Sequence, residues 1–228
     1  MGVIADNIAE VKRKIDAAKE EQDVTLIAVT KTHSPDMINE AIDAGITDIG
    51  ENKVQEIMEK YDSVKPVRWH LIGHLQSNKV KYIIDKVSLI HSVDSVKLLD
   101  EIERQAAKLG KVQKVLIQVN ITGEESKFGI DVSELDGILE YVGTLKHVKV
   151  MGLMTILVKL DSEMSNRLHF NNIFNKFVDI SSKKYDNVTM KYLSMGMSGD
   201  YELAVSCGSN MVRVGSAIFG ARDYNTIK

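Results

Sequence analysis

Two glycine- and serine-rich turns near the end of the chain have the composition of a phosphate site. The first begins at Ser198, which we expect to be the N-cap of a helix that holds Asp200 in its first turn. The second, Gly215 and Ser216, follows a short apolar strand and leads into another helix. Strand-to-helix turns of this kind offer unpaired backbone N–H groups, a hydroxyl and the positive end of a helix dipole. Together the two turns predict a binding site for a phosphate dianion.

A lysine near the start of the chain is placed to react with an aldehyde. Lys31 follows the apolar run Leu26–Thr30, which is typical of a buried parallel strand. In a partly dry site, desolvation disfavours the ammonium and lowers the pKa of the amine. The neutral amine is the form that makes a Schiff base with an aldehyde. The lysine and the phosphate site together predict that the ligand is a phosphorylated aldehyde, and pyridoxal 5′-phosphate (PLP) is the common one. The alternative is a surface lysine that extends its head into solvent.

One arginine lies inside a predicted strand. Arg213 stands between Val212 and Val214, and an arginine that points into a protein interior needs a partner. We expect this partner to be a pyridine ring nitrogen. A permanent cation there would keep the nitrogen unprotonated and make the ring a poorer electron sink. The alternative is an ion pair with a carboxylate such as Glu51.

The composition narrows the class of protein. The chain has 228 residues, of which 44% are hydrophobic, enough for one sizeable core. Its formal net charge of −3, with both signs well mixed, gives no sign of a nucleic-acid or membrane partner. Cys207 is the only cysteine, and the N-terminus lacks the pattern of a secretory leader. We therefore expect a cytoplasmic protein, and no histidine pattern predicts a metal site.

Strand-like and helix-like runs alternate after an amphipathic N-terminal helix whose apolar positions run from Val3 to Ile15. The strand-like runs are Leu26–Thr30, Asp48–Gly50, Trp69–Gly73, Leu89–Val93, Val115–Ile121, Val150–Thr155, Tyr192–Met195 and Val212–Gly215. Further helices are expected to start at Ser34, Ser95, Asp131 and Ser198. Gly123–Lys127 is the most loop-like insertion after a strand.

This alternation predicts an α/β fold: a single (β/α)8 barrel of the TIM type with an extra N-terminal helix, spanning residues 1–228 as one domain. The runner-up is an open doubly wound sheet, but no Gly-x-Gly-x-x-Gly follows the first strand. In a barrel, the carboxyl ends of the strands form the mouth. The polar residues expected there are Lys31, Glu51, Asn52, His74, Asn120, Thr155, Ser198, Arg213, Gly215 and Ser216. We interpret the histidines as structural or loop residues.

Several motifs, spread over nearly the whole chain, carry a resemblance to a known family. They are Ala28–Lys31, Gly50–Glu56, Trp69–Lys79, Asn120 with Glu125–Gly129, Gly152–Met154 and the two C-terminal turns. With these motifs in this order, the sequence resembles the pyridoxal phosphate homeostasis proteins. That family is similar to the barrel domain of alanine racemase, in the fold-type III PLP enzymes.

The resemblance implies a role for each site residue. By this resemblance, Lys31 carries PLP as a covalent aldimine, Asn52 lies near the ring and Arg213 faces the pyridine nitrogen. The residues implied to hold the phosphate are Ser198, Gly215 and Ser216. The implied function is PLP binding in vitamin B6 homeostasis, as a carrier or reservoir without catalytic turnover. We expect a monomer whose candidate partners, besides PLP, are apo PLP enzymes.

Two other functions remain open from the sequence. One is an amino-acid racemase or related PLP enzyme, which needs an acid/base group on each face of the cofactor. Alanine racemase takes its second group, a tyrosine, from an additional domain and a partner subunit, and we expect no room for that domain in a chain ending at Lys228. The other is a cofactor-free Schiff-base lyase of the class I aldolase kind.

Overall fold

Eight strands form a closed parallel barrel, as the alternation of runs predicts. The computed structural model describes residues 2–121, 128–157 and 162–220. Neighbouring strands follow the order β4-β3-β2-β1-β9-β8-β7-β5, and β4 also pairs with β5, which closes the ring. All these pairs are parallel. The barrel strands are β1 (Thr25–Val29), β2 (Asp48–Glu51), β3 (Arg68–Leu71), β4 (Leu89–Val93), β5 (Gln113–Asn120), β7 (Val148–Met154), β8 (Val188–Met197) and β9 (Met211–Val214).

A further short strand was not expected from the sequence. β6 (Ile130–Asp131) pairs with the end of β5, with Ile130 opposite Val119. Two residues carry too little apolar pattern to stand out as a strand, which explains the miss. The segment Gly123–Lys127, expected to be a loop, lies outside the described residues.

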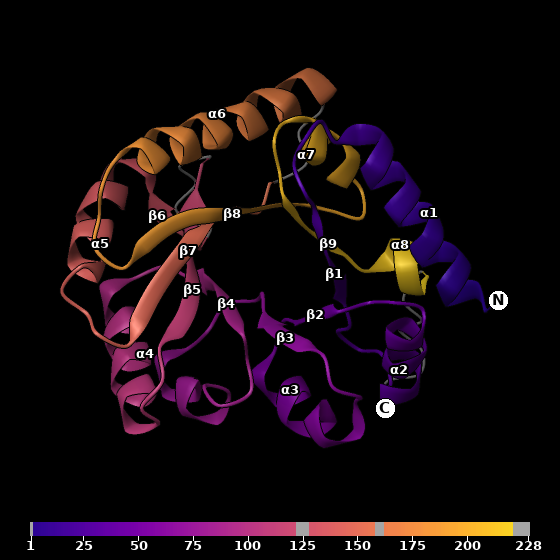
Figure 1. The fold of residues 1–228 in the computed structure, drawn as a ribbon, viewed down its shortest axis with the longest axis horizontal. Helices are drawn as coiled ribbons and strands as arrows, with labels where there is room; N and C mark the ends of the chain where they lie inside the picture. Colours follow the sequence, from indigo (N-terminus) through magenta and orange to yellow (C-terminus); the bar gives the residue numbers. More distant parts are fainter. Residues whose placement is uncertain (1, 122–127, 158–161, 221–228) are drawn as a thin grey trace.

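Helices surround the ring of strands on its outside (Figure 1). They are α1 (Val3–Ala18), α2 (Pro35–Asp43), α3 (Val54–Lys60), α4 (Val96–Lys108), α5 (Leu135–Val142), α6 (Glu163–Ser182), α7 (Tyr201–Ser206) and α8 (Ser216–Phe219). The described residues also form three 3-10 helices: η1 (Tyr61–Ser63), η2 (Ser77–Tyr82) and η3 (Val132–Glu134). α1 packs against α2, α7 and α8, so the first helix covers the side of the barrel where β1 pairs with β9. Among the described residues, no helix combines the length and apolar character that crossing a bilayer requires.

Most of the predicted helix starts are confirmed by side-chain caps. The Ser34 hydroxyl accepts the Met37 N–H at 3.4 Å at the start of α2, and Ser95 caps α4 in the same way. Asp131 and Glu134 form a reciprocal capping box at η3. Each pairing satisfies an N–H group that the first turn of a helix leaves without a partner.

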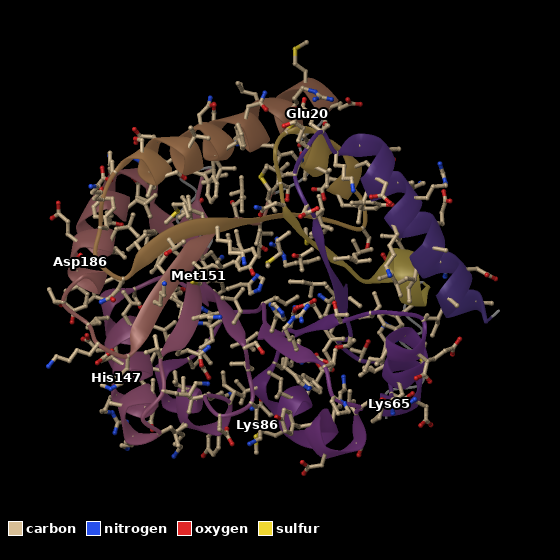
Figure 2. The ribbon with its side chains drawn as sticks, viewed as in Figure 1. Glu20, Lys65, Lys86, His147, Met151 and Asp186 are labelled. Carbon is tan, nitrogen blue, oxygen red and sulfur yellow. The ribbon has the colours of Figure 1, made fainter. Side chains whose placement is uncertain are left out.

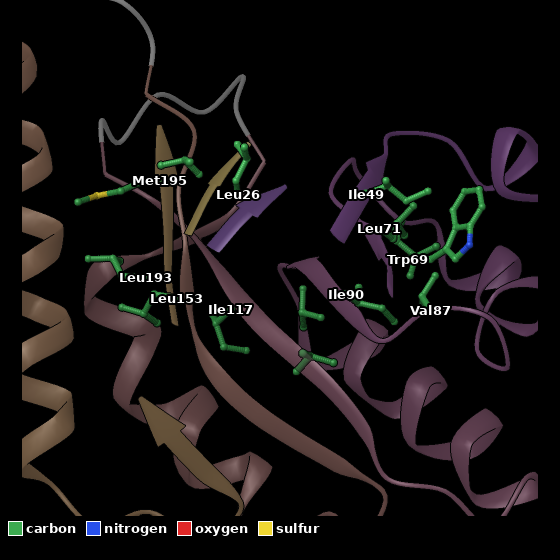
Figure 3. Close-up of a cluster of buried hydrophobic side chains, with 14 of the residues drawn as sticks. Leu26, Ile49, Trp69, Leu71, Val87, Ile90, Ile117, Leu153, Leu193 and Met195 are labelled. Carbon is green, nitrogen blue, oxygen red and sulfur yellow. The ribbon is translucent and has the colours of Figure 1, made fainter. Parts of the chain in front are cut away.

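Apolar side chains fill two layers. The larger layer lies between strands and helices, and Figure 3 shows some of its members, among them Ile49, Trp69 and Leu193. α1 adds Ile4 and Ile15 to this layer, while its first residue, Val3, is 75% exposed. The smaller layer lies inside the barrel, because successive strand residues face opposite sides of the sheet. Its members are Ile27, Leu89, Leu116, Met151, Met154 and Met211. Figure 2 shows Met151 within the ring and charged residues such as Lys65 and Asp186 at its outer edge.

Candidate functional site

The carboxyl ends of β1 and β9 bring the lysine and the second glycine turn to the same end of the barrel. The two strands pair in parallel, with Ala28 opposite Val214. One residue further on, a Cβ added at Gly215 would lie 3.3 Å from the Cβ of Val29. Lys31 follows Val29 by two residues, in a turn where its side chain is half-buried. The register of two neighbouring strands therefore places Lys31 and Gly215 at adjoining strand ends.

The two predicted phosphate turns meet through one hydroxyl group. Ser198 Oγ accepts the backbone N–H of Gly215 at 3.0 Å and that of Ala217 at 3.4 Å. Ser216, the first residue of α8, lies between these two donors and is exposed. Two N–H groups therefore converge on a single oxygen, an arrangement in which oxygen atoms of a phosphate would be stronger acceptors than a hydroxyl.

The predicted role of Ser198 as a helix N-cap is wrong. α7 begins at Tyr201 with Asp200 as its N-cap, so Asp200 does not lie in the first turn. The Asp200 carboxylate instead accepts the backbone N–H of Met197 at 2.6 Å, which closes the turn locally. This closure leaves the Ser198 hydroxyl to reach across to the neighbouring turn, a contact that local sequence cannot reveal.

Asn52 lies immediately beyond the end of β2 and is held by a close approach of two backbones. A Cβ added at Gly73 would lie 2.3 Å from the Asn52 carbonyl oxygen and 2.8 Å from its Cα. Only glycine leaves room for this approach. The loop after β3 therefore supports the backbone of Asn52, whose side chain is half-buried.

Arg213 points into the barrel and does not pair with Glu51. Its Nη1 donates to the Ser194 carbonyl oxygen at 2.9 Å and to the Ser194 hydroxyl at 2.5 Å, and Nη2 donates to the Thr155 carbonyl oxygen at 2.8 Å. Burial lowers the pKa of Arg213 to about 10, and the nearby Asp200 opposes that shift. The guanidinium therefore remains a cation near neutral pH.

Glu51 belongs to a different cluster, which holds the backbone on both sides of Lys31. Lys60 Nζ donates to the Thr30 carbonyl oxygen at 3.0 Å, to Glu51 Oε1 at 2.8 Å and to Glu56 Oε2 at 2.7 Å. Glu56 Oε2 also accepts the Thr32 N–H at 2.6 Å. Burial raises the pKa of Glu51, whereas for Glu56 the bonds from Lys60 and Thr32 outweigh burial and lower the pKa.

The backbone after Lys31 is strained, and this cluster holds it in place. Thr32 has φ of 68°, a left-handed conformation that a β-branched residue rarely adopts. Such a conformation costs on the order of 1–3 kcal/mol and persists only where surrounding contacts impose it. Sequence reasoning missed Lys60 and Glu56, although a lysine on the buried face of a short helix was a signal that could have found them.

The remaining polar residues of the predicted mouth are less closely connected. Thr155 donates its hydroxyl to the Val119 carbonyl oxygen at 3.1 Å. His74 stacks on Phe128 with ring centroids 3.9 Å apart, and its Nδ1 lies 3.3 Å from Asp94. Asn120 ends β5 and is half-buried. Within the described ranges, no group of three or more His, Cys, Asp or Glu residues could hold a metal ion.

Comparison with known proteins matches this geometry to one family. The model of the alanine racemase N-terminal domain matches residues 2–223. A pyridoxal phosphate homeostasis protein of Aquifex aeolicus is 43% identical over 210 residues, covering 91% of each chain. One of Escherichia coli is 38% identical over 235 residues, covering 99% of each chain. The crystal structure of PipY from Synechococcus elongatus with PLP bound is 32% identical with a TM-score of 0.84, covering 95% of this chain and 100% of PipY.

Proposed function

Because this chain belongs to the pyridoxal phosphate homeostasis protein family, with the barrel of the alanine racemase N-terminal domain, we propose that it binds PLP and works as a carrier or reservoir in vitamin B6 homeostasis. Its relatives bear the name of a homeostasis protein rather than of an enzyme, and PLP occupies the solved structure of PipY. No catalytic turnover is part of this function.

The convergence of two backbone N–H groups on Ser198 is the observation that carries the proposal. Gly215 and Ala217 donate to one oxygen, and Gly215 lies next to the strand that leads to Lys31. A phosphate group fits these donors, with Ser216 as a further hydroxyl at the same turn. Lys31 is the residue that we assign to the Schiff base, since its amine is the nucleophile at the adjoining strand end.

Arg213 and Asn52 are assigned to the ring of the cofactor. PLP supplies an aldehyde and an electron-accepting pyridine ring. The three hydrogen bonds of Arg213 use three of the five N–H groups of a guanidinium, so two remain for a ligand within the described structure. A donor cation beside the ring nitrogen keeps that nitrogen unprotonated. This weakens the ring as an electron sink, as suits a protein that stores PLP without using it.

The wider biological role is also part of the proposal. We assign residues 1–228 to one PLP-binding domain that works as a monomer in the cytoplasm. Apo PLP enzymes are the recipients that fit a carrier, because they complete the same Schiff-base exchange with a lysine of their own. Nucleic acids and membranes are not among the proposed partners.

A transfer assay tests this function against a racemase. The PLP-loaded protein is mixed with an apo PLP enzyme, and recovery of that enzyme's activity is followed beside a racemisation assay with L-alanine. We expect PLP transfer and no measurable racemisation. Racemisation within the ordinary enzyme range of about 1–1000 per second would contradict the proposal, and so would PLP that never leaves the barrel.

A further inference from the structure

A chain of buried polar side chains crosses the inside of the barrel. Its members come from five strands: Asp48 of β2, His70 of β3, His91 of β4, Ser194 of β8 and Arg213 of β9. None is more than 4% exposed. Their neighbours along the strands, such as Leu71, Leu193 and Val214, pack in the outer layer, so alternation turns the polar residues inward. Barrel interiors of this kind are filled mainly by branched apolar residues, so a polar chain there is unusual.

Consecutive members of the chain lie within hydrogen-bonding distance. Asp48 Oδ1 is 3.0 Å from His70 Nε2, and His70 Nδ1 is 3.0 Å from His91 Nε2. His91 Nδ1 is 3.1 Å from the Ser194 hydroxyl, which also accepts from Arg213 Nη1 at 2.5 Å. The chain therefore links the guanidinium on β9, by way of β8, β4 and β3, to the carboxylate at the start of β2.

With both imidazoles uncharged and Asp48 ionised, one set of proton positions gives every contact in this chain a donor and an acceptor. Arg213 has donors only, so the Ser194 oxygen accepts from it, and the hydroxyl proton is left to point at His91 Nδ1. His91 then carries its proton on Nε2 and donates to His70 Nδ1. His70 in turn donates from Nε2 to the carboxylate of Asp48. In this arrangement each imidazole carries one proton, and all donors run from the cation to the anion.

The charges at the two ends suit this direction. Burial alone would raise the pKa of Asp48, but hydrogen bonds from His70, Arg68 and Thr47 outweigh it and hold the pKa well below its usual range. Asp48 is therefore an acceptor at neutral pH. Burial is the main cause that lowers the pKa of His91 well below its usual range, in keeping with a neutral ring.

From this geometry we propose that His91, acting through Ser194 and backed by His70 and Asp48, is a positioning residue that holds Arg213 for the PLP ring nitrogen. The inference rests on the proposed function and deepens it. Ser194 has one hydroxyl proton, which it donates to His91 in a hydrogen bond, so the lone pairs of its oxygen stay turned toward Arg213. Without His91, that hydroxyl is free to rotate and the guanidinium loses its fixed acceptor.

The proton directions are measured directly in the protein without PLP. Nitrogen-15 NMR of histidine-labelled protein distinguishes protonated from unprotonated ring nitrogens. We expect both His70 and His91 to carry a proton on Nε2 only, at neutral pH. A proton on Nδ1 of His91 would overturn the inference, because His91 would then donate to the Ser194 oxygen and could not accept its hydroxyl proton.

Substitutions at His91 test the effect on PLP. His91→Phe removes both ring nitrogens, and we expect PLP affinity to fall about tenfold with a shift of the visible absorption band. His91→Gln keeps one acceptor and one donor but cannot become a cation, so affinity and band should return close to wild type. Ser92→Ala is the matched control, because Ser92 is equally buried on β4 and its hydroxyl has no hydrogen-bond partner in the described structure.

The outcomes separate this inference from the proposed function. Wild-type protein that fails to bind PLP would overturn both. Normal PLP binding and an unchanged band in His91→Phe would overturn the positioning role alone. If His91→Phe fails to fold, the His91→Gln variant decides. Wild-type PLP affinity in His91→Gln supports a neutral His91, whereas a roughly tenfold loss of PLP affinity in that variant overturns the positioning role.

Discussion

At the scale of single residues, the proposed phosphate site combines hydroxyl groups with half-buried backbone donors. Ser198 accepts from Gly215 and Ala217, and Ser216 stands between them. We expect the double variant Ser198→Ala with Ser216→Ala to weaken PLP binding by about 1–3 kcal/mol, because each hydroxyl lost is a hydrogen bond to a charged group. Titration of the purified variant with PLP, followed by absorbance, gives the value.

Pyridoxal, which lacks the phosphate, is the control for this prediction. It should bind weakly to the wild-type protein and lose little in the double variant. Equal losses for PLP and pyridoxal would show that these turns do not read the phosphate.

The buried carboxylate of Asp48 should leave a signature in the pH dependence of stability. Its pKa is lowered in the folded protein, so the unfolded chain binds the proton more readily. The stabilisation is therefore complete well above the unfolded pKa of about 3.9, begins to fall below it, and is lost as the pH falls through the lower folded pKa. We expect Asp48→Asn to lower the free energy of unfolding by about 1–3 kcal/mol at pH 7, and by less near pH 3.

Urea unfolding at both pH values measures this difference. Asp43→Asn is the matched control, because Asp43 pairs with Lys65 on the surface, where its side chain is 62% exposed. A surface ion pair contributes about 0–1 kcal/mol to the free energy of unfolding. An Asp48→Asn loss that stays constant down to pH 3 would contradict the account.

Among the single residues, those that we assign to the site stand out in the sequence, whereas the residues that support them do not. Lys31 and Gly215 stand out because a lysine or a glycine turn ends an apolar strand. Lys60 and His91 do not, because their partners are distant: His91 meets Ser194 across 103 positions. The alternative partner for Arg213, Glu51, is wrong, because neighbouring strand ends do not determine which side chains meet.

At the scale of elements, the site needs the loop after β3 to pass close to the end of β2. A Cβ at residue 73 would overlap the Asn52 carbonyl oxygen. We expect Gly73→Ala to lower the free energy of unfolding by about 1–3 kcal/mol, as overpacking does, and to weaken PLP binding as Asn52 moves.

Gly137→Ala is the matched control for this element. Gly137 lies in α5, and a Cβ there meets no atom within 4 Å. Alanine should stabilise that helix by about 0.5–1 kcal/mol. Thermal unfolding and PLP titration compare the stability and the PLP affinity of Gly73→Ala and Gly137→Ala. If the two variants have similar stability and PLP affinity, the role given to Gly73 is contradicted.

A helix or strand is predictable from the sequence where its signal lies in neighbouring residues. β4 has the predicted bounds, and Ser34 and Ser95 cap the helices expected of them. β8 runs from Val188 and is longer than the apolar run, because its first residues are partly exposed and look polar in the sequence. Ser198 follows the same local rule as Ser34, but a tertiary contact overrides it.

At the scale of the whole molecule, the parallel barrel brings distant parts of the sequence to one end. β1 closes the ring against β9, so the first strand and the last pair directly (Figure 1). The alternation of runs predicts the barrel, and the register of β1 and β9 then joins Lys31 to the glycine turn. The hydrogen bonds between interior side chains across the ring depend on the packed structure, so the sequence pattern does not predict them.

The assignment of Lys31 is the central claim, and one measurement tests it most directly. The protein is incubated with PLP, reduced with borohydride and digested, and the peptides are mapped by mass spectrometry. We predict the pyridoxyl phosphate group on Lys31 alone, and no stable adduct in Lys31→Ala protein that still folds. Modification of a different lysine in the wild-type protein, or a retained adduct in Lys31→Ala, would contradict the account.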